Sequence, residues 1–298
     1  GVGTDNGENV YLNCNCRDDF GDIRFTAGDG TSLLDYWIES QTEGDNAVCW
    51  VEVAYDLSFL GQTIYIYYGN SDASSSSNGD DTFLFYDHFL GASLDLTKWE
   101  ITYGSPFVSS SYVHFHGVQR IRTRNTVVTT GMMARVKANL ITIGSDPEIS
   151  LTISTIPYPD SSNSARFSFY TLEKYTRTYK DSVGESYPWT YSTGEKIYDI
   201  YRNSTTSVVF VRDGTVINTH TLQVPTVDLK IASSCDAADH MDWDFVFVRK
   251  YVSPEPAHGS WGIEESASGE TTTDSWWFAG MPILVLTVIG VATVILLS

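Results

Sequence analysis

The chain ends in an unbroken apolar run, residues 276–298, that contains no charged side chain. As an α-helix this run would extend about 34 Å, which exceeds the roughly 30 Å hydrocarbon core of a bilayer. A buried core helix is the alternative, but core helices are rarely apolar on every face over such a length. The run therefore predicts one C-terminal transmembrane helix, with Trp276 and Trp277 as its interfacial anchors.

The rest of the chain is acidic and rich in aromatic residues. It has 18 Lys and Arg against 37 Asp and Glu, a formal net charge of −19, which argues against nucleic acid as a partner because phosphates need a basic surface. Tyrosine, tryptophan and short clusters of Gly, Ser, Thr and Asn are typical of an all-β extracellular protein. We expect an ectodomain outside a single-pass anchor, at a cell surface or in a virion envelope.

The order of strand-like and polar segments predicts two β-sandwich or jelly-roll-like domains before the transmembrane helix. Ile64 and Ile66 alternate with tyrosines as in a half-buried strand, and Asp213-Gly214 between two alternating runs predicts a hairpin. A Ser-rich connector, 71–81, marks the first boundary. The predicted parts are a first β domain, a second β-sandwich, a polar stalk and the helix: 1–80, 81–263, 264–275 and 276–298.

Three segments of the first domain carry a family resemblance. DDFGDIRFTAGDGTSLLDYWIES (18–40), CWVEV (49–53) and TIYIYYGNSDASSSSNGDDTFLFYDHF (63–89) resemble the DUF2341 domain of archaeal and bacterial surface proteins, a match that covers roughly residues 1–80. From Phe85 onward, LDLTKWEI (94–101) and DWDFVFVRKYVSPEP (242–256) are similar to a concanavalin A-like, LamG-type jelly roll. The resemblance implies a surface location and a binding or structural role, and it brings no catalytic residues with it.

The chain begins inside the DUF2341 pattern, which in this family usually has strands further upstream. The first domain is therefore expected to lack its first strands and to leave a sheet edge unpaired. Another chain could fill such an edge by strand addition. We expect a homo- or hetero-oligomer in which a neighbouring chain supplies strands.

No catalytic set is found, so the sequence predicts a protein that is not an enzyme. Jelly-roll glucanases carry three acidic residues spaced two apart on one strand, whereas Asp242 and Asp244 form only a pair. His114 and His116 are also two apart, but no His or Cys nearby in the sequence offers a third metal ligand, so no metal site is predicted. No G-x-S-x-G elbow is present.

No cofactor is predicted, although calcium is a better candidate than zinc. LamG-like sandwiches often hold Ca²⁺ at a loop rim, and acidic clusters occur at Asp18, Asp19 and Asp22 and at Asp80, Asp81 and Asp87. Neither cluster has EF-hand spacing. Solvated acidic loops are the favoured interpretation.

Aromatic residues in the segment 175–195 are the best candidates for ligand binding. Tyrosine and tryptophan stack on sugar rings and supply rigid contact area, while serine adds adaptable hydrogen bonds. The same residues would also suit contacts between proteins in an assembled layer, and the sequence does not separate these alternatives. The candidates are Tyr175, Tyr179, Tyr187, Trp189 and Tyr191.

The cysteines and one sequon complete the set of candidate sites. Cys14 or Cys16 is expected to form a disulfide with Cys49, and a metal site at the C-x-C pair is the rival interpretation. Asn203-Ser204-Thr205 is an N-glycosylation sequon beside a predicted turn.

The sequence therefore predicts one function, with two alternatives. The predicted function is that of a non-enzymatic, membrane-anchored structural or adhesive component of an archaeal-type cell envelope or of a virion envelope. The alternative is a membrane-displayed carbohydrate-binding protein that recognises glycans. An undetected glycan hydrolase is a third, weaker interpretation.

Overall fold

The computed structural model describes residues 4–5, 9–53, 62–144, 147–152, 162–169, 174–190, 192–251, 255, 258–262, 265–266, 282–288 and 292–297. The chain divides into two compact units. Unit 1 combines Gly1–Thr82 with Ser253–Ser298, and unit 2 is Phe83–Val252. The prediction of an all-β protein is confirmed, because the only helix in the described ranges is α1 (Gly79–Thr82).

Unit 1 contains two sheets. The four-stranded sheet has the order β1 (Asn9–Tyr11), β25 (Ala292–Leu297), β5 (Asn46–Val51) and β4 (Tyr36–Thr42). The six-stranded sheet has the order β22 (His258–Trp261), β24 (Pro282–Val288), β6 (Gln62–Tyr67), β2 (Arg24–Ala27) and β3 (Leu33–Leu34), and β23 (Glu265–Ser266) also pairs with β24.

Both sheets of unit 1 contribute to one hydrophobic core. Ile64 and Ile66 of β6 are buried in it, as their alternation in the sequence predicts. Other members come from the neighbouring β2 and from β5 of the four-stranded sheet, including Phe25, Ala47, Cys49 and Val51. A sandwich arranged in this way buries the apolar face of each sheet against the other.

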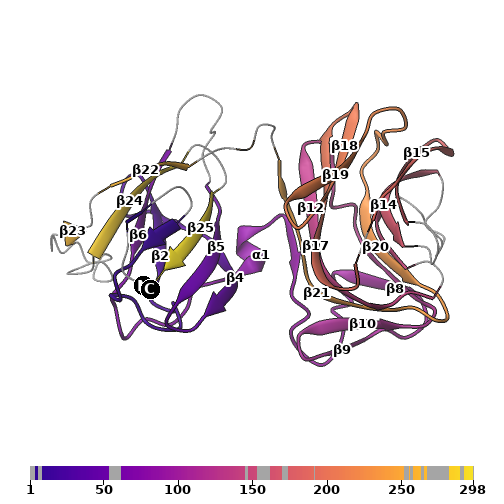
Figure 1. The fold of residues 1–298 in the computed structure, drawn as a ribbon. Coiled ribbons are helices and arrows are strands. Elements are labelled where there is room, and N and C mark those ends of the chain that lie inside the picture. The colour runs from indigo at the N-terminus through magenta and orange to yellow at the C-terminus, as the bar shows by residue number, and fades with distance from the viewer. Residues whose placement is uncertain are drawn as a thin grey trace. The chain divides into compact units, whose positions relative to one another are not determined.

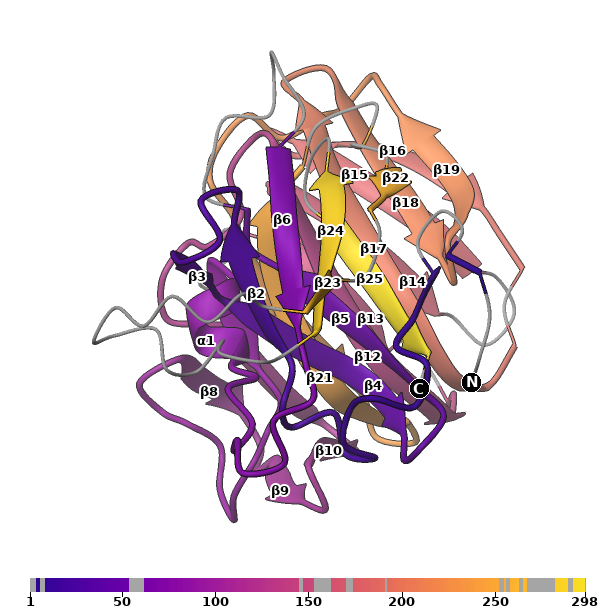
Figure 2. The same cartoon turned by 90° about the vertical axis from the view of Figure 1, so that its left-hand side faces the viewer.

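The C-terminal apolar run supplies strands to both sheets of unit 1. Figure 2 shows β24 beside β6, with which it pairs in antiparallel register from Ile283↔Tyr67 to Val288↔Gln62. Strand β25 pairs antiparallel with β5 and parallel with β1. These segments are rich in Val, Ile and Leu, and β-branched residues are also favoured in strands.

This arrangement overturns two predictions. Among the residues that the structure describes, no helix has the length and hydrophobicity needed to cross a membrane. The predicted transmembrane helix was therefore wrong, and with it the predicted location as a single-pass membrane protein. An apolar run does not by itself distinguish a helix from strands. The expected anchors Trp276 and Trp277, and most of the expected stalk, lie outside the described residues.

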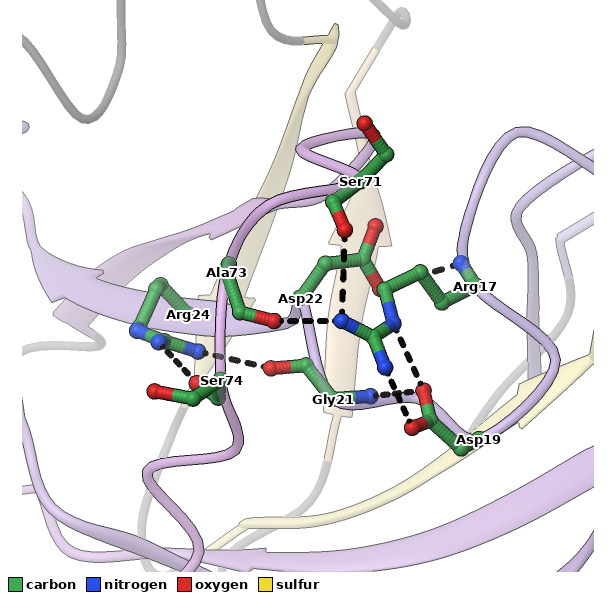
Figure 3. A network of polar contacts seen from close by, with 8 residues as sticks. All are labelled: Arg17, Asp19, Gly21, Asp22, Arg24, Ser71, Ala73 and Ser74. Atoms are coloured by element: carbon green, nitrogen blue, oxygen red, sulfur yellow. Dashed lines mark hydrogen bonds and ion pairs between the residues drawn. The ribbon is translucent and has the colours of Figure 1, made fainter.

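A network of polar contacts holds two loops of unit 1 together (Figure 3). The guanidinium of Arg17 donates to both carboxylate oxygens of Asp19, at 2.9 and 2.7 Å, and to the carbonyls of Ser71 and Ala73. Buried Asp22 accepts backbone N–H groups from Arg17 and from Gly69. These contacts tie the loop before β2 to the Ser-rich connector after β6.

A second arginine extends the network toward the core. Buried Arg24 donates to the carbonyls of Gly21, Ile23 and Ser74, so its charge is solvated by backbone dipoles. The Arg17–Asp19 ion pair is exposed and contributes little by itself. The backbone contacts of Arg17, Arg24 and Asp22 therefore matter more for the position of these loops.

Unit 2 is a second sandwich, whose two sheets face each other in Figure 1. The eight-stranded sheet has the order β19 (Thr215–His220), β18 (Ser207–Arg212), β17 (Gly194–Ser204), β12 (Met132–Thr142), β21 (His240–Lys250), β10 (Tyr112–His116) and β9 (Phe107–Ser109), and β7 (Phe85–Asp87) also pairs with β21. The seven-stranded sheet has the order β16 (Val183–Pro188), β15 (Lys174–Lys180), β14 (Asn163–Phe169), β13 (Glu148–Thr152), β20 (Lys230–Cys235), β11 (Gln119–Thr123) and β8 (Trp99–Tyr103).

Aromatic side chains from both sheets pack in the core of unit 2. Trp243 of β21 meets Trp99 and Phe115 edge to face, with ring centroids 6.2 and 5.5 Å apart. The Trp99 indole N–H donates to buried Asp87 at 2.6 Å. Burial raises the Asp87 pKa, and the hydrogen bonds from Trp99 and from the Phe89 backbone partly oppose that shift.

The predicted hairpin at Asp213-Gly214 is confirmed. Strands β18 and β19 are antiparallel, with Arg212↔Thr215 as their last pair before the turn. Asp213 and Gly214 both have positive φ, 48° and 74°, as a two-residue turn matching the right-handed strand twist requires.

A buried histidine links the two sheets of unit 2. Both ring nitrogens of His220 lie within hydrogen-bond distance of threonine hydroxyls, Thr176 at 2.8 Å and Thr178 at 2.9 Å. Burial lowers the His220 pKa from 6.5 to about 4, although nearby Glu185 acts in the opposite direction. His220 is therefore neutral in the folded protein near neutral pH.

The stability of unit 2 is expected to fall between pH 6.5 and pH 4. An unfolded chain protonates His220 near pH 6.5, whereas the folded protein does so only near pH 4, so acid favours unfolding in this window. The loss from this residue is at most about 3 kcal/mol. Denaturant unfolding of wild type and His220→Gln at several pH values measures it. Equal pH slopes for the two proteins would contradict the assignment.

Candidate functional site

The polar face of the eight-stranded sheet is the side opposite the core of unit 2. On β12, Val136 and Ala138 pack into the core, so Lys137 between them faces the other way. On β21, Met241 and Trp243 are core residues, and Asp242 faces away from them. Strict alternation in the sequence thus places charged side chains on one side of a well-packed sheet.

A second carboxylate, Asp244, lies on the same face, because it comes two residues after Asp242 on the strand and contacts outward-facing Lys137. It is also the site of a β-bulge. Trp243 pairs with Ala138 and Phe245 pairs with Lys137, which leaves Asp244 as an extra residue in β21. Bulges of this kind are common beside functional sites.

Asp244 is held by an ammonium and an imidazole. The Lys137 ammonium lies 2.8 Å from Asp244 Oδ2, and His88 Nε2 lies 3.1 Å from Oδ1. Burial would raise the Asp244 pKa, but the hydrogen bonds from His88 and Lys137 outweigh burial and lower it. Asp244 is therefore ionised over the whole physiological pH range.

Lys137 also binds a second carboxylate, from β17. Its ammonium lies 2.9 Å from Glu195 Oε1, and the Tyr112 hydroxyl donates to Glu195 Oε2 at 3.1 Å. Burial lowers the pKa of Lys137 in part, but its two carboxylate partners raise it overall. We call His88, Tyr112, Lys137, Glu195 and Asp244 the Asp244 cluster.

Solvent reaches the Asp244 cluster at one side. The side chain of Glu195 is 40% exposed and that of Lys137 26%, whereas that of Asp244 is 12% exposed. Phe107, which is 46% exposed, stacks on His114 of the neighbouring strand with centroids 4.7 Å apart. The polar face thus presents charged hydrogen-bonding groups beside an accessible aromatic ring.

Strand pairing brings the His114 and His116 pair to a carboxylate. Asp242 lies directly opposite His114 in the β10–β21 ladder, with His114 Nδ1 2.8 Å from Asp242 Oδ1. His116 Nε2 lies 3.5 Å from the same oxygen. One ligand atom of each residue lies within 4.8 Å of the others, so these three residues could hold a metal ion. The sequence offered no third ligand because Asp242 is distant along the chain.

The aromatic residues predicted to bind a ligand lie in different settings. Tyr175 and Tyr179 are on β15, where each ring is covered by an arginine, Arg177 and Arg166 respectively. Tyr187 on β16 is 39% exposed and packs on His220.

The segment around these tyrosines consists largely of strands. Trp189 is buried in the core, in contact with Phe167 and Phe169, and Tyr191 lies outside the described residues. The structure does not bring these residues together with the Asp244 cluster, and their role in binding stays a prediction.

The other predicted sites are placed as follows. The thiols of Cys14, Cys16, Cys49 and Cys235 are free, so the expected bridge to Cys49 is not formed in this structure. Burial raises the pKa of the Cys16 thiol to about 11. Asn203 lies near the end of β17, and its amide donates to the Ser207 hydroxyl at 3.4 Å. Glycosylation there stays a prediction.

Three of the six acidic residues considered for calcium bind protein groups. Asp19 pairs with Arg17, Asp22 accepts backbone N–H groups and Asp87 accepts the Trp99 indole N–H. Calcium binding by these clusters stays a prediction.

Sequence reasoning missed three members of the Asp244 cluster: His88, Lys137 and Glu195. They lie far apart along the chain, and only the strand order brings them together. Only Lys137 has a signal in the sequence, the alternation of charged with apolar residues in ARVKANL (134–140).

Comparison with known protein families finds a match to part of the chain. The model of the domain of unknown function DUF2341 matches residues 19–102, which includes most of the stretch on which the resemblance was based. No curated protein sequence matches the chain.

Solved structures are similar to part of the chain at low identity. A β-1,3-glucanase from Mycobacterium marinum is 14% identical, with a TM-score of 0.44, 56% of this chain covered and 98% of that one. A β-1,3-1,4-glucanase from a mouse hindgut metagenome has the same identity and coverages and a TM-score of 0.46. A pseudo β-1,3-glucanase of Mycobacterium tuberculosis is 14% identical, with a TM-score of 0.43 and coverages of 56% and 98%.

These similarities correct one prediction. The sequence was interpreted as that of a protein that is not an enzyme, whereas the similar structures are mostly described as glucanases or glycosyl hydrolases. The prediction rested on the absence of three acids at regular spacing in the sequence. That criterion does not detect acidic residues that separate strands bring together, and the prediction is withdrawn.

Replacing Lys137 by methionine is expected to raise the pKa of Asp244. The variant loses the ammonium at 2.8 Å that stabilises the ionised carboxylate, while the aliphatic part of the side chain is kept. Carbon-13 NMR titration of the Asp244 carboxyl measures the shift. Lys196→Met is the matched control, because Lys196 pairs with Asp213 instead. An unchanged Asp244 titration in Lys137→Met would contradict the described network.

Proposed function

We propose that unit 2 binds carbohydrate on its polar face, through the Asp244 cluster and the adjacent aromatic rings. The observation that carries this proposal is the row of partly exposed charged groups formed by Asp244, Lys137 and Glu195. Carboxylates accept hydrogen bonds from sugar hydroxyls, and an ammonium donates to them. Charge-assisted bonds of this kind are stronger than neutral ones.

Aromatic side chains near the cluster supply the apolar part of such a site. Tyr112 is bound to Glu195 through its hydroxyl, and Phe107 is nearly half exposed on the neighbouring strand. A sugar ring has apolar C–H faces and polar edges, so it matches a surface that combines rings with charged groups. The net charge of −19 disfavours strongly anionic polymers as ligands, which favours neutral glycans.

The geometry also limits how the face would interact with a sugar. Lys137 is bound to both Asp244 and Glu195, so a ligand meets side chains that are already ordered. Preorganised groups lose less conformational entropy on binding than free side chains do. The carboxylates of Asp242 and Asp244 lie on the same face. Because glycoside hydrolysis generally uses two carboxyl groups, the experiment on glycan binding also measures cleavage of the glycan.

A second candidate function is a structural or adhesive role in which copies of the chain exchange strands. The observation that favours it is the origin of β24 and β25, which follow unit 2 in the chain and yet complete both sheets of unit 1. A segment that pairs in this way with its own unit 1 also matches the same edge in a second copy. Such an exchange would join neighbouring chains into an assembly.

Glycan binding is expected to depend on Asp244. Screening the full chain against an array of neutral oligosaccharides, followed by calorimetry on those that bind, should give affinities that fall about tenfold or more in Asp244→Asn. Asp213→Asn, in an exposed hairpin, is the matched control and should bind as wild type. Reducing-sugar release from the same glycans tests for cleavage. Equal affinity of Asp244→Asn and wild type would exclude this face as the binding site.

Strand exchange is expected to produce a specific crosslink between copies. Thr63 and Thr287 are directly opposite in the β6–β24 ladder, so cysteines there are placed to form a disulfide. Two single variants, Thr63→Cys and Thr287→Cys, are refolded together in a Cys14→Ser/Cys16→Ser background and oxidised. A disulfide-linked dimer supports exchange. Efficient bridging within the Thr63→Cys/Thr287→Cys double variant, with no dimer from the two single variants, would show that each chain completes its own sheet. Thr293→Cys, which lies on β25 in the other sheet, replaces Thr287→Cys in the control mixture and should not crosslink to Thr63→Cys.

A further inference from the structure

Four polar side chains form a two-by-two grid on β10 and β21, beside the Asp244 cluster. In the antiparallel ladder His114 is opposite Asp242, and His116 is opposite His240. Residues two apart on a strand share a face, and directly opposite residues on neighbouring strands do so too. The rings of His116 and His240 are stacked, with centroids 4.5 Å apart. Three imidazoles and one carboxylate are thus gathered on one patch.

The strands below this grid are firmly packed. Val113 and Phe115 alternate with the two histidines of β10 and are fully buried, as are Met241 and Trp243 next to Asp242 on β21. These core residues fix the backbone positions from which the ligand atoms project. A rigid support of this kind is what a metal site needs, because coordination tolerates only small errors in ligand position.

The atoms are spaced as a small divalent ion requires. Bonds of about 2.0–2.2 Å to nitrogen and oxygen place tetrahedral ligand atoms roughly 3.4 Å apart. His116 Nε2 and Asp242 Oδ1 are 3.5 Å apart, and His114 Nδ1 and the same oxygen are 2.8 Å apart. All three ligand atoms lie within 4.8 Å of one another. Small side-chain rotations are enough to surround an ion.

The second ring nitrogen of His114 also has a suitable partner. His114 Nε2 lies 2.9 Å from the Ser109 hydroxyl and 3.2 Å from the Ser109 carbonyl oxygen. With Nε2 protonated, the ring donates to the carbonyl and presents the lone pair of Nδ1 toward Asp242 Oδ1. Those two acceptors then need a cation between them. Metal-binding histidines usually donate their other N–H to a carbonyl or a carboxylate in this manner.

Without a metal the same contacts accommodate a proton. The Ser109 hydroxyl then donates to Nε2, and Nδ1–H donates to Asp242. The ring nitrogens of His114 therefore have hydrogen-bond partners in the structure without a metal ion as well.

We propose that His114, His116 and Asp242 bind a divalent transition-metal ion of the Zn²⁺ type, through Nδ1, Nε2 and Oδ1 respectively. Two imidazoles favour Zn²⁺, Cu²⁺ or Ni²⁺, whereas Ca²⁺ requires six to eight oxygen ligands. Three protein ligands leave one position open to water or to an oxygen of a bound molecule. The site does not depend on the proposed glycan binding, because metal affinity is measured without any glycan.

The decisive experiment measures Zn²⁺ affinity of the full chain by competition with a chromophoric chelator. A Cys14→Ser/Cys16→Ser background removes the thiols that could bind zinc elsewhere. We expect one Zn²⁺ per chain and an affinity at least about tenfold lower in both His116→Ala and Asp242→Asn. His116 is 38% exposed on its side chain, so its replacement leaves the fold intact.

A matched control and a second readout complete the test. His88→Gln also removes an imidazole from the polar face, but His88 binds Asp244 and should not alter zinc affinity. Zn²⁺ should raise the thermal unfolding temperature of wild type and not that of His116→Ala. Absence of stoichiometric Zn²⁺ binding by the wild type, or equal affinity in wild type, His116→Ala and Asp242→Asn, would overturn the proposal. A loss of glycan binding in Asp244→Asn alone bears only on the proposed function.

Discussion

The packing of the inward side chains of β21 into the core is the constraint on which the rest of unit 2 depends. This strand lies between β12 and β10, and its inward residues include Trp243, which contacts aromatic rings from both sheets. Burial of a side chain of this size contributes about 3 kcal/mol. Because the inward residues fix the register, the outward residues Asp242 and Asp244 have no freedom to change face.

The polar face is therefore a consequence of how the core packs. Lys137 and His114 reach the two carboxylates from strands that neighbour β21, and His88 does so from the residue that follows β7. Removing charges from water is costly unless they are paired, and each carboxylate of β21 has a cationic or imidazole partner. The result is a charged surface that is ordered before any ligand arrives.

The sequence was informative wherever a property is local. The alternation of Ile64 and Ile66, the hairpin at Asp213-Gly214 and the all-β class all follow from neighbouring residues, and the structure confirms them. The role of the C-terminal run was not local. Its residues 282–288 and 292–297 form strands only because β6 and β5 offer edges for them, and no pattern within the run records those partners. The same limitation concealed the position of Asp242 opposite His114, since this pairing joins residues that are far apart along the chain.

The bulge at Asp244 lies where β21 changes partners. On one side of the strand, β10 pairs with residues up to Trp243, and β7 begins to pair at Val246. On the other side, the pairing with β12 shifts by one residue at the same point. The sheet consequently contains a seam, and the imidazole grid lies on one side of it. The Asp244 cluster spans the seam, because Tyr112 and Glu195 lie on the side of the grid whereas His88 follows β7 on the other side. A change in twist at the seam would therefore alter the spacing within the Asp244 cluster while leaving the geometry of the grid unchanged.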